Sequence, residues 1–318
     1  MSERVCVIVN PAAGRGRGAL MLPQLTSAFG QVGVTDIRTT TGPGEEHDLA
    51  NAAIADGCTT IVAVGGDGTS GNVANALLHG GRSVRLAVMP AGTGNDFAKV
   101  LCTNSIDAFT MARLSVTPSD ISLDVGRIED TYFLNCCGFG FDVAVLQELD
   151  RTNWLRGPSV YIFAALKQLF SYRGFDVSVG AGKDVRSDKH MMLVIANGPF
   201  FGGTFCIAPS ASLNDGMLDA VSILDLPPSK RLSMLSAAIK GRHVGRPEVV
   251  TRRAEQFEVS FAEPPWYETD GELHRAQSST LRIISCAAAL RVVALQATMQ
   301  ILPVTSPAHS LAASRTPL

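Results

Sequence analysis

Three short apolar runs in this chain each end in a glycine-rich turn, and this recurrence constrains the fold more than any other feature. The runs are Val5–Val9, Ile61–Val64 and Leu86–Met89. Continuous runs of β-branched and aliphatic residues are typical of strands in a parallel sheet that is covered on both faces. Helical patterns separate the runs, so the first part of the chain is predicted to form βαβ units.

The turns that follow these runs are Asn10–Gly16, Gly65–Asn72 and Pro90–Phe97. In open α/β sheets, ligands bind beyond the carboxyl ends of the strands, where these turns would converge. Glycine lets backbone N–H groups approach an anion closely, which favours a polyphosphate site. Asp67 and Asp96 would repel phosphate unless a divalent cation stood between them. A nucleotide with magnesium is therefore the first hypothesis.

Composition sets the outer limits. The 318 residues are 46% hydrophobic and 18% charged, which is enough for a large core and suggests two domains. A formal net charge of −2 gives no reason to expect nucleic-acid binding. The cysteines show no Cys-x-x-Cys pair, which argues against zinc and for a reducing cytoplasm. We find no signal-peptide pattern and no run long enough to span a bilayer, so we expect a cytoplasmic protein whose membrane contact is peripheral.

The predicted fold is α/β plus β. An α/β nucleotide-binding domain with a parallel sheet is expected over residues 1–122, and a β-rich sandwich domain over 123–280. Residues 281–297 are a candidate to rejoin the first domain, although the sequence alone cannot place them, and 298–318 read as a disordered tail. The helices expected in the first domain are Gly18–Phe29, Glu45–Ala55, Gly71–Leu78 and Asn95–Leu101. The elements expected in the second are strands Tyr132–Cys136, Phe175–Val179, Met191–Ile195, Leu218–Val221 and Phe257–Phe261, and helices Ser159–Phe170 and Ser229–Ile239.

Five motifs together carry a family resemblance. They are Val9–Gly14, Val64–Thr69, Pro90–Ala98, Asn214–Gly216 and Asp270–Glu272. With these motifs in this order, the chain resembles the diacylglycerol kinase catalytic-domain family of lipid kinases, which includes bacterial soluble lipid kinases and sphingosine kinases. The resemblance implies a first domain related in loop chemistry to NAD kinase and phosphofructokinase, followed by a β-sandwich. It also implies Mg²⁺-dependent transfer of the ATP γ-phosphate to a lipid hydroxyl, giving a phosphatidic-acid-type product.

The same resemblance implies which residues bind ATP. They are Asn10, Pro11, Ala12, Ala13, Gly14, Gly65, Gly66, Asp67, Gly68, Thr69, Ser70, Gly71, Asn72, Thr93, Asn95 and Asp96. A threonine ahead of the second helix also contacts nucleotide in relatives. Thr39, Thr40 and Thr41 are the candidates, and Thr40 is favoured by its distance from Gly44; a polar linker is the alternative.

Asp270-Gly271-Glu272 is the acid–base candidate. A lipid hydroxyl is a poor nucleophile, so a positioned carboxylate must accept its proton as the P–O bond forms. Glycine permits a sharp turn that presents both carboxylates to one cleft, and the same residues also predict a plain hairpin turn. The base stays open among Glu272, Asp270 and Asp67.

Ser212–Met217 resembles the family's second-domain metal loop. The resemblance implies a structural Mg²⁺ held by the Asp215 side chain and the carbonyls of Ser212 and Met217, all oxygen ligands of the kind Mg²⁺ prefers. An ordinary Asn-Asp-Gly turn is the alternative. Lys167 is a candidate for reaching the phosphates, with a solvated surface lysine as its alternative.

The expected partner is a lipid with a free hydroxyl, and its identity is left open. Seven basic residues between Lys230 and Arg253, beside Met234, Leu235 and Ile239, form a candidate patch for anionic lipid, although a solvated helix face is the default. A homodimer is common among relatives. Two other functions compete with the lipid kinase: an NAD kinase-like phosphotransferase with a soluble acceptor, and a non-catalytic nucleotide- or lipid-binding protein.

Overall fold

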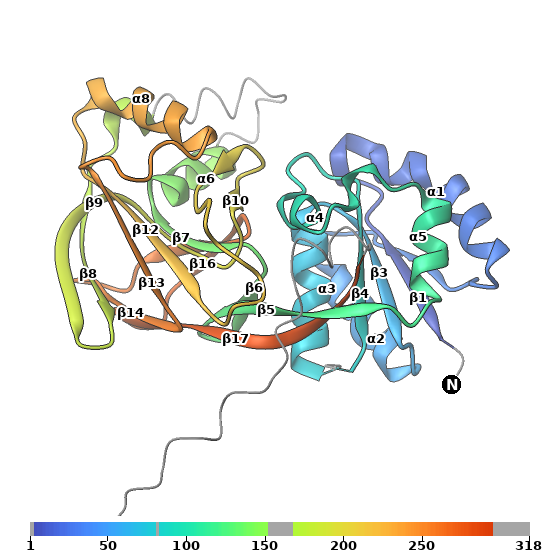
Figure 1. Ribbon diagram of the computed structural model, residues 1–318. Helices are drawn as coiled ribbons and strands as arrows, with labels where there is room; N and C mark the ends of the chain where they lie inside the picture. Colours follow the sequence, from blue (N-terminus) through green and yellow to red (C-terminus); the bar gives the residue numbers. More distant parts are fainter. Residues whose placement is uncertain (1–2, 81–82, 152–167, 295–318) are drawn as a thin grey trace, which may run out of the picture.

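The computed structural model describes residues 3–80, 83–151 and 168–294, which form two domains lying side by side (Figure 1). Lys167, most of the helix expected at Ser159–Phe170 and the tail 298–318 lie outside the described residues. The strands of the first domain are β1 (Val5–Val9), β2 (Ile37–Thr39), β3 (Thr60–Gly65) and β4 (Arg85–Pro90). Its helices are α1 (Ala13–Gln31), α2 (Glu45–Ala55), α3 (Asp67–Gly80), α4 (Asp96–Val100), the 3₁₀ turn η1 (Thr103–Ser105) and α5 (Ala108–Ser115).

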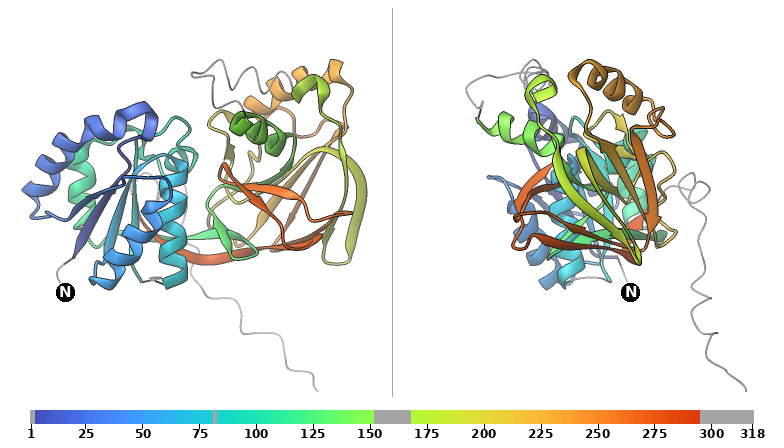
Figure 2. Two further views of the ribbon diagram at one scale, coloured as in Figure 1. Left: turned by 180° about the vertical axis from the view of Figure 1, so that it is seen from behind. Right: turned by 90° about the vertical axis from the view of Figure 1, so that its left-hand side faces the viewer.

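The sheet of the first domain is parallel, in the order β4-β3-β1-β2. All five residues of β1 are buried, as expected of a strand covered on both faces. One face packs against α2, α3 and α4 through residues such as Ala50, Val73 and Phe97. The other face packs against α1 and α5 through Phe29 and Met111. The views in Figure 2 show this sheet between its two helical layers.

Two long strands cross from one domain to the other along the lower edge of Figure 1. They are β5 (Asp120–Ile128) and β17 (Thr280–Val293), which pair antiparallel over most of their length. The end of β17 also pairs parallel with β4, at Val292 and Leu86. The segment that the sequence could not place thus extends the first domain's sheet, and its start, paired with β14 (Gln256–Ser260), belongs to the second.

The second domain is an antiparallel sandwich. Its further strands are β6 (Thr131–Phe133), β7 (Cys136–Gly140), β8 (Phe175–Ala181), β9 (Asp184–Ala196), β10 (Phe200–Phe201), β11 (Phe205–Cys206), β12 (Leu218–Leu224), β13 (Val249–Ala254), β15 (Trp266–Thr269) and β16 (Glu272–Arg275). Its helices include α6 (Phe141–Arg151) and α8 (Pro228–Ile239). Alternate residues of β7 serve two cores: Cys137 and Phe139 face the interior of the sandwich, and Cys136 faces the layer under α6 and α8. The fold class predicted from the sequence is confirmed.

Individual elements follow the sequence to different degrees. The helix at Glu45–Ala55 has the predicted bounds. The strand expected at Tyr132–Cys136 is instead split between β6 and β7, because the N–H groups of Leu134 and Asn135 donate to the Asp270 side chain rather than to a neighbouring strand. Neither α5 nor α6 was predicted from the sequence. Asp107, whose side chain accepts from Thr110 N–H, was the available signal for the start of α5.

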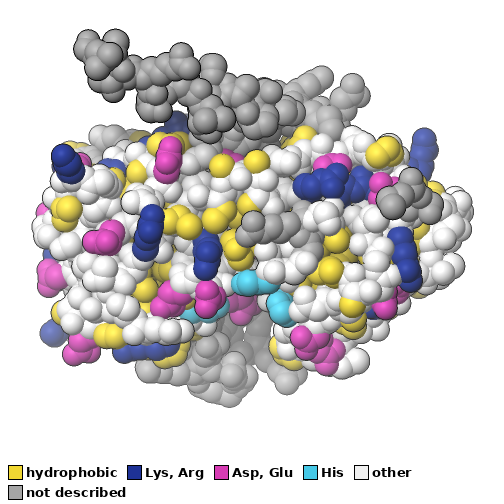
Figure 3. Space-filling view, turned by 90° about the horizontal axis from the view of Figure 1, so that it is seen from below, with side chains coloured by type: hydrophobic (Ala, Val, Ile, Leu, Met, Phe, Trp, Pro, Cys, Tyr) yellow, Lys and Arg dark blue, Asp and Glu magenta, His cyan; other side chains and the backbone are white. Residues whose placement is uncertain are grey.

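Acidic, basic and apolar side chains are interspersed over the face of the molecule seen from below (Figure 3). Among the described residues, no helix has both the length and the apolar character needed to cross a membrane.

Candidate active site

The first glycine-rich turn is held by the side chain of Asn10. Its Oδ1 accepts hydrogen bonds from the N–H groups of Ala12 (3.0 Å) and Ala13 (3.1 Å). Gly14 has a positive φ of 57°, and a Cβ there would lie 2.0 Å from the carbonyl oxygen of Ala91. Gly14 is therefore required for the first turn to touch the third.

A buried glutamate that the sequence analysis missed ties this turn to the helices behind it. Glu46, in the first turn of α2, is 2% exposed. Its carboxylate accepts from Asn10 Nδ2 (2.9 Å), Thr69 Oγ1 (3.1 Å) and Asn72 Nδ2 (3.5 Å). Glu46 thus joins the first predicted nucleotide turn, through Asn10, to the second, through Thr69 and Asn72. A glutamate at the start of a helix was the only available signal.

The second and third turns meet through glycines. A Cβ on Gly92 would lie 2.4 Å from Gly66 Cα, and one on Gly65 would lie 2.2 Å from Thr69 Oγ1. Asn95, with a φ of 55°, fixes the third turn by accepting from Gly92 N–H (3.0 Å) and donating to its carbonyl (2.9 Å). The turns that the sequence predicted to converge do so, and Asn95 shapes the backbone of the third.

Asp67 begins α3 in the middle of this cluster. Its Oδ1 accepts a hydrogen bond from Phe97 N–H (3.3 Å). Burial, followed by the nearby charge of Asp96, raises the pKa of Asp67 above its ordinary value. A carboxylate in this position gains from an added cation.

Asp96 has a different environment from the one expected of a free magnesium ligand. Its Oδ1 pairs with Lys99 Nζ (2.7 Å), and its Oδ2 accepts from Gly203 N–H (2.8 Å). Lys99 Nζ also donates to the Gly203 carbonyl (2.7 Å), and its charge lies 5.6 Å from the centre of the Phe200 ring. Asp96 and Lys99 therefore latch the third turn to the β10–β11 hairpin of the second domain.

The two carboxylates of the Asp270-Gly271-Glu272 turn are not equivalent. Asp270 has a φ of 49°, and its side chain accepts three backbone hydrogen bonds, from Leu134 (2.6 Å), Asn135 (2.8 Å) and Cys136 (3.0 Å). Burial raises the pKa of Asp270 to about 6, although these three donors act in the opposite direction. Glu272, by contrast, is exposed on β16, and a Cβ on Gly68 would lie 3.0 Å from its Oε1.

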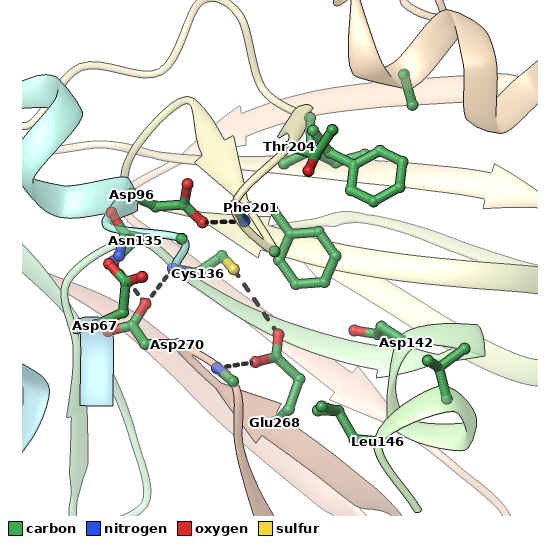
Figure 4. A pocket seen from close by; sticks show the side chains of 18 of the residues that line it. Asp67, Asp96, Asn135, Cys136, Asp142, Leu146, Phe201, Thr204, Glu268 and Asp270 are labelled. Carbon is green, nitrogen blue, oxygen red and sulfur yellow. Dashed lines mark hydrogen bonds between the residues drawn. The ribbon is translucent and has the colours of Figure 1, made fainter. Parts of the chain in front are cut away.

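A cavity of about 640 Å³ connects this polar cluster to the second domain. Asp67, Asp96 and Asp270 line one end of it (Figure 4). The other end lies between the sheet and the helices α6 and α8. That end is lined by apolar side chains, which include Phe141, Val145, Met192, Phe201, Ile223 and Leu235. Asp142 and Glu268 line the wall between the two ends, and neither was predicted from the sequence to be a site residue.

The candidate metal loop is already paired. The Asp215 carboxylate forms an ion pair with Arg253 and accepts from Met217 N–H (3.0 Å). Asp124, buried beside it, accepts from Gly216 N–H (2.6 Å) and Ala288 N–H (2.7 Å). A cation on Asp215 would have to compete with the Arg253 guanidinium, so this loop does not fit a resident Mg²⁺ as it stands.

The threonines ahead of α2 divide into two roles. Thr40 is buried at the end of β2, where its N–H donates to the Val9 carbonyl (3.0 Å). Thr41 is instead tied to the start of the following helix: its N–H and hydroxyl both donate to the Glu45 carboxylate, at 2.6 and 2.7 Å. Thr40 therefore lies beside the first turn and stays the candidate for nucleotide contact.

Comparison with known proteins agrees with this architecture. Residues 4–128 match the model of the diacylglycerol kinase catalytic domain, and residues 135–294, half of the chain, match that of the YegS C-terminal NAD kinase beta sandwich-like domain. A diacylglycerol kinase of Bacillus subtilis (strain 168) is 27% identical over 272 residues, covering 85% of this chain and 90% of that protein.

A diacylglycerol kinase of Mycobacterium tuberculosis (strain CDC 1551 / Oshkosh) is 29% identical over 145 residues, 43% of this chain and 47% of that protein. The fold is also that of a crystal structure of a diacylglycerol kinase from Bacillus anthracis strain Sterne. The TM-score is 0.69 at 20% identity, over 93% of this chain and 98% of that one. The chain therefore belongs to the family of lipid kinases that joins a diacylglycerol kinase catalytic domain to a YegS-type β-sandwich domain.

Proposed function

We propose that this chain transfers the γ-phosphate of ATP to the hydroxyl of a lipid in a Mg²⁺-dependent reaction, giving a phosphatidic-acid-type product. One observation carries the proposal: a single cavity has phosphate-binding turns and carboxylates at one end and apolar side chains at the other. A soluble, polar acceptor would make no use of the apolar side chains that line the other end. The nucleotide end and the lipid end belong to different domains, so the reaction would take place where the domains meet.

The first-domain turns would bind the nucleotide. Their glycines bring backbone N–H groups close together, and the first turn of α3 begins at Asp67, where unpaired N–H groups favour an anion. Asn10 and Glu46 would act from behind by fixing the turns. The exposed side chain of Arg17, which reaches the Gly92 carbonyl (3.4 Å), lies at the same junction.

The residues here fit a Mg²⁺ ion that accompanies the nucleotide. Asp67 offers carboxylate oxygens in the cavity, and burial, followed by the charge of Asp96, raises its pKa; a divalent cation would offset both effects. When bound, Mg²⁺ would neutralise charge on the transferring phosphate. Asp96, held by Lys99 and Gly203, would contribute by aligning the third turn.

We assign proton acceptance to Glu272 and a positioning role to Asp270. The Asp270 oxygens accept three backbone hydrogen bonds, so this side chain holds the β6–β7 junction in place. The Glu272 carboxylate makes no hydrogen bond or ion pair to any described residue, and it faces Gly68 in the first turn of α3. A carboxylate beside the anion-binding helix end can receive the hydroxyl proton as the new P–O bond forms.

The lipid would enter from the side of α8. Leu235 and Ala238 of this helix line the apolar end of the cavity, while Leu232 and Ile239 are 61% and 42% exposed on its outer face. Lys240 at its C-terminal end adds a positive charge near these side chains. This arrangement supports peripheral contact with an anionic membrane. Arg231, which the sequence placed in this patch, is instead buried and donates to the Leu226 carbonyl (2.7 Å).

The test is a kinase assay with γ-labelled ATP, Mg²⁺ and total lipid extract in mixed micelles, followed by chromatography of the organic phase. Wild-type protein should label a lipid, and Glu272→Gln should lower turnover by about 10²-fold or more with no change in thermal stability. Glu263→Gln, an exposed glutamate in the lead-in to the same hairpin, is the matched control and should retain activity. Label confined to the aqueous phase would contradict the lipid acceptor, and full activity of Glu272→Gln would contradict the choice of base.

A further inference from the structure

Two buried carboxylates line the middle of the cavity and take no part in the reaction described above. Asp142 lies in the first turn of α6 and is 6% exposed, and Glu268 lies on β15 and is fully buried. In Figure 4, Glu268 lies between the Asp67–Asp270 cluster and Asp142, which is the acid nearer to the apolar end. Any molecule that reaches from one end of the cavity to the other passes this pair.

The two side chains converge on one point. A Cβ added to Gly138 of β7 would lie 1.9 Å from Asp142 Oδ2 and 2.6 Å from Glu268 Oε1. Both carboxylates therefore occupy the space above this glycine. Such an approach puts like charges together, and sharing a proton is the usual way in which a buried pair relieves that repulsion.

The hydrogen bonds of this pair are incomplete. Glu268 Oε2 accepts from Gly271 N–H (2.7 Å), and its Oε1 receives only the weak Cys136 Sγ donor (3.8 Å). Neither oxygen of Asp142 has a hydrogen-bond partner among the described residues, and no described cation pairs with either acid. Burial raises the pKa of Asp142 to about 7; burial and the charge of Asp142 raise the pKa of Glu268 well above its usual range.

An unpaired polar group destabilises the fold when it is buried, and more so when it is charged. Here the unused lone pairs face a cavity rather than packed protein, so a ligand can satisfy them. Each of these carboxyl oxygens, protonated or not, keeps a lone pair that only a hydrogen-bond donor can satisfy. The matching ligand must therefore donate.

We propose that Asp142 and Glu268 form the subsite that recognises the polar head of the acceptor lipid, and that this acceptor carries a second hydrogen-bond donor, a hydroxyl or an amine, next to the hydroxyl that is phosphorylated. This inference rests on the proposed function, which places the acceptor lipid at the apolar end of the cavity. A head group whose other oxygens are all ester acceptors, as in a diacylglycerol, would leave the Asp142 oxygens unsatisfied, so the phosphatidic-acid-type product would be one that keeps a free hydroxyl or amine beside its phosphate. Sites that are built to bond a donor discriminate strongly against analogues that lack it.

Binding and turnover are measured separately. Binding is followed by calorimetry on the full chain with a non-hydrolysable ATP analogue and Mg²⁺, using decanol, the matching vicinal diol, the matching vicinal amino alcohol and dioctanoylglycerol. The diol or the amino alcohol should bind at least about 10-fold more tightly than decanol and dioctanoylglycerol. The stronger of the two identifies the donor.

Asp142→Asn and Glu268→Gln preserve side-chain size and should each remove most of that preference, whereas Glu248→Gln, on the surface beside Lys230, should keep it. Equal or tighter binding of decanol or dioctanoylglycerol, or a preference that survives both substitutions, would overturn the inference. If a variant does not fold, the wild-type probe series alone decides. Donor-dependent binding without labelled lipid would refute the proposed function and leave the subsite standing.

Discussion

Replacing Gly92 by alanine tests whether the contact between the second and third turns positions the nucleotide. The new Cβ would lie 2.4 Å from Gly66 Cα and 2.8 Å from Asn95 Oδ1, whereas ordinary contacts begin at 3.4 Å. The two turns must therefore separate by about 1 Å, because the obstacle at Gly66 is backbone that cannot rotate away. Overpacking of this kind costs about 1–3 kcal/mol of folding free energy.

The functional effect should exceed the loss of stability. A displacement of about 1 Å at a reacting group can lower turnover by about 10²-fold. We expect Gly92→Ala to fold, to unfold at a lower temperature and to bind a non-hydrolysable ATP analogue more weakly, as measured by thermal denaturation and calorimetry. Gly30→Ala is the control, since a Cβ at Gly30 in α1 meets no atom within 4 Å and alanine favours a helix. A Gly92→Ala protein with wild-type nucleotide affinity and melting temperature would refute the reasoning.

Three further predictions concern charged groups. The pKa of Asp142 is about 7 in the folded protein and about 4 in the unfolded chain, so the stabilisation that protonation provides is complete below about pH 4 and is lost as pH rises through about 7. The melting temperature of the wild type, measured relative to that of Asp142→Asn, should therefore fall between about pH 5 and pH 8. Parallel curves for the two proteins would contradict this. Lys99→Met should reduce the free energy of unfolding in urea by about 1–3 kcal/mol, because buried Asp96 loses its cation and keeps only the Gly203 N–H. The same change should speed proteolysis of the β10–β11 hairpin, and unchanged values for both would argue against the latch. Because Arg253 already pairs with Asp215, Mg²⁺ added without nucleotide should shift the melting temperature equally in wild type and in Asp215→Asn, and a shift confined to the wild type would establish a metal at that loop.

Prediction from sequence succeeded where function depends on local backbone. The three turns were readable because buried parallel strands are continuous apolar runs and because glycines mark where backbones approach, as Gly14 does against Ala91. Their residue types also indicated a nucleotide, which the kinase family implies, and a cation, which stays a prediction. The same local reading predicted the bounds of α2 correctly, since acidic residues begin it and Gly57 follows it.

Prediction stopped where side chains from distant segments meet. Asp142 and Glu268 are unremarkable in the sequence, and only the pairing of β7 with β15 brings them over Gly138. The roles within Asp270-Gly271-Glu272 could not be separated either, because they depend on the N–H groups of the β6–β7 junction. Asp96 was expected at a magnesium ion, yet its partners Lys99 and Gly203 are fixed by the contact between domains.

The path of β17 has a consequence for how the chain is made. Leu290 and Val292 are buried in the core of the first domain, although the whole second domain precedes them in the sequence. During translation, the edge of β4 stays unpaired until these residues have been synthesised, after the whole second domain. An unpaired strand edge can form hydrogen bonds with a wrong strand in that interval. A gene fragment that stops near residue 128 would give a nucleotide domain without its last strand. The first domain is therefore completed only after the whole second domain has been synthesised.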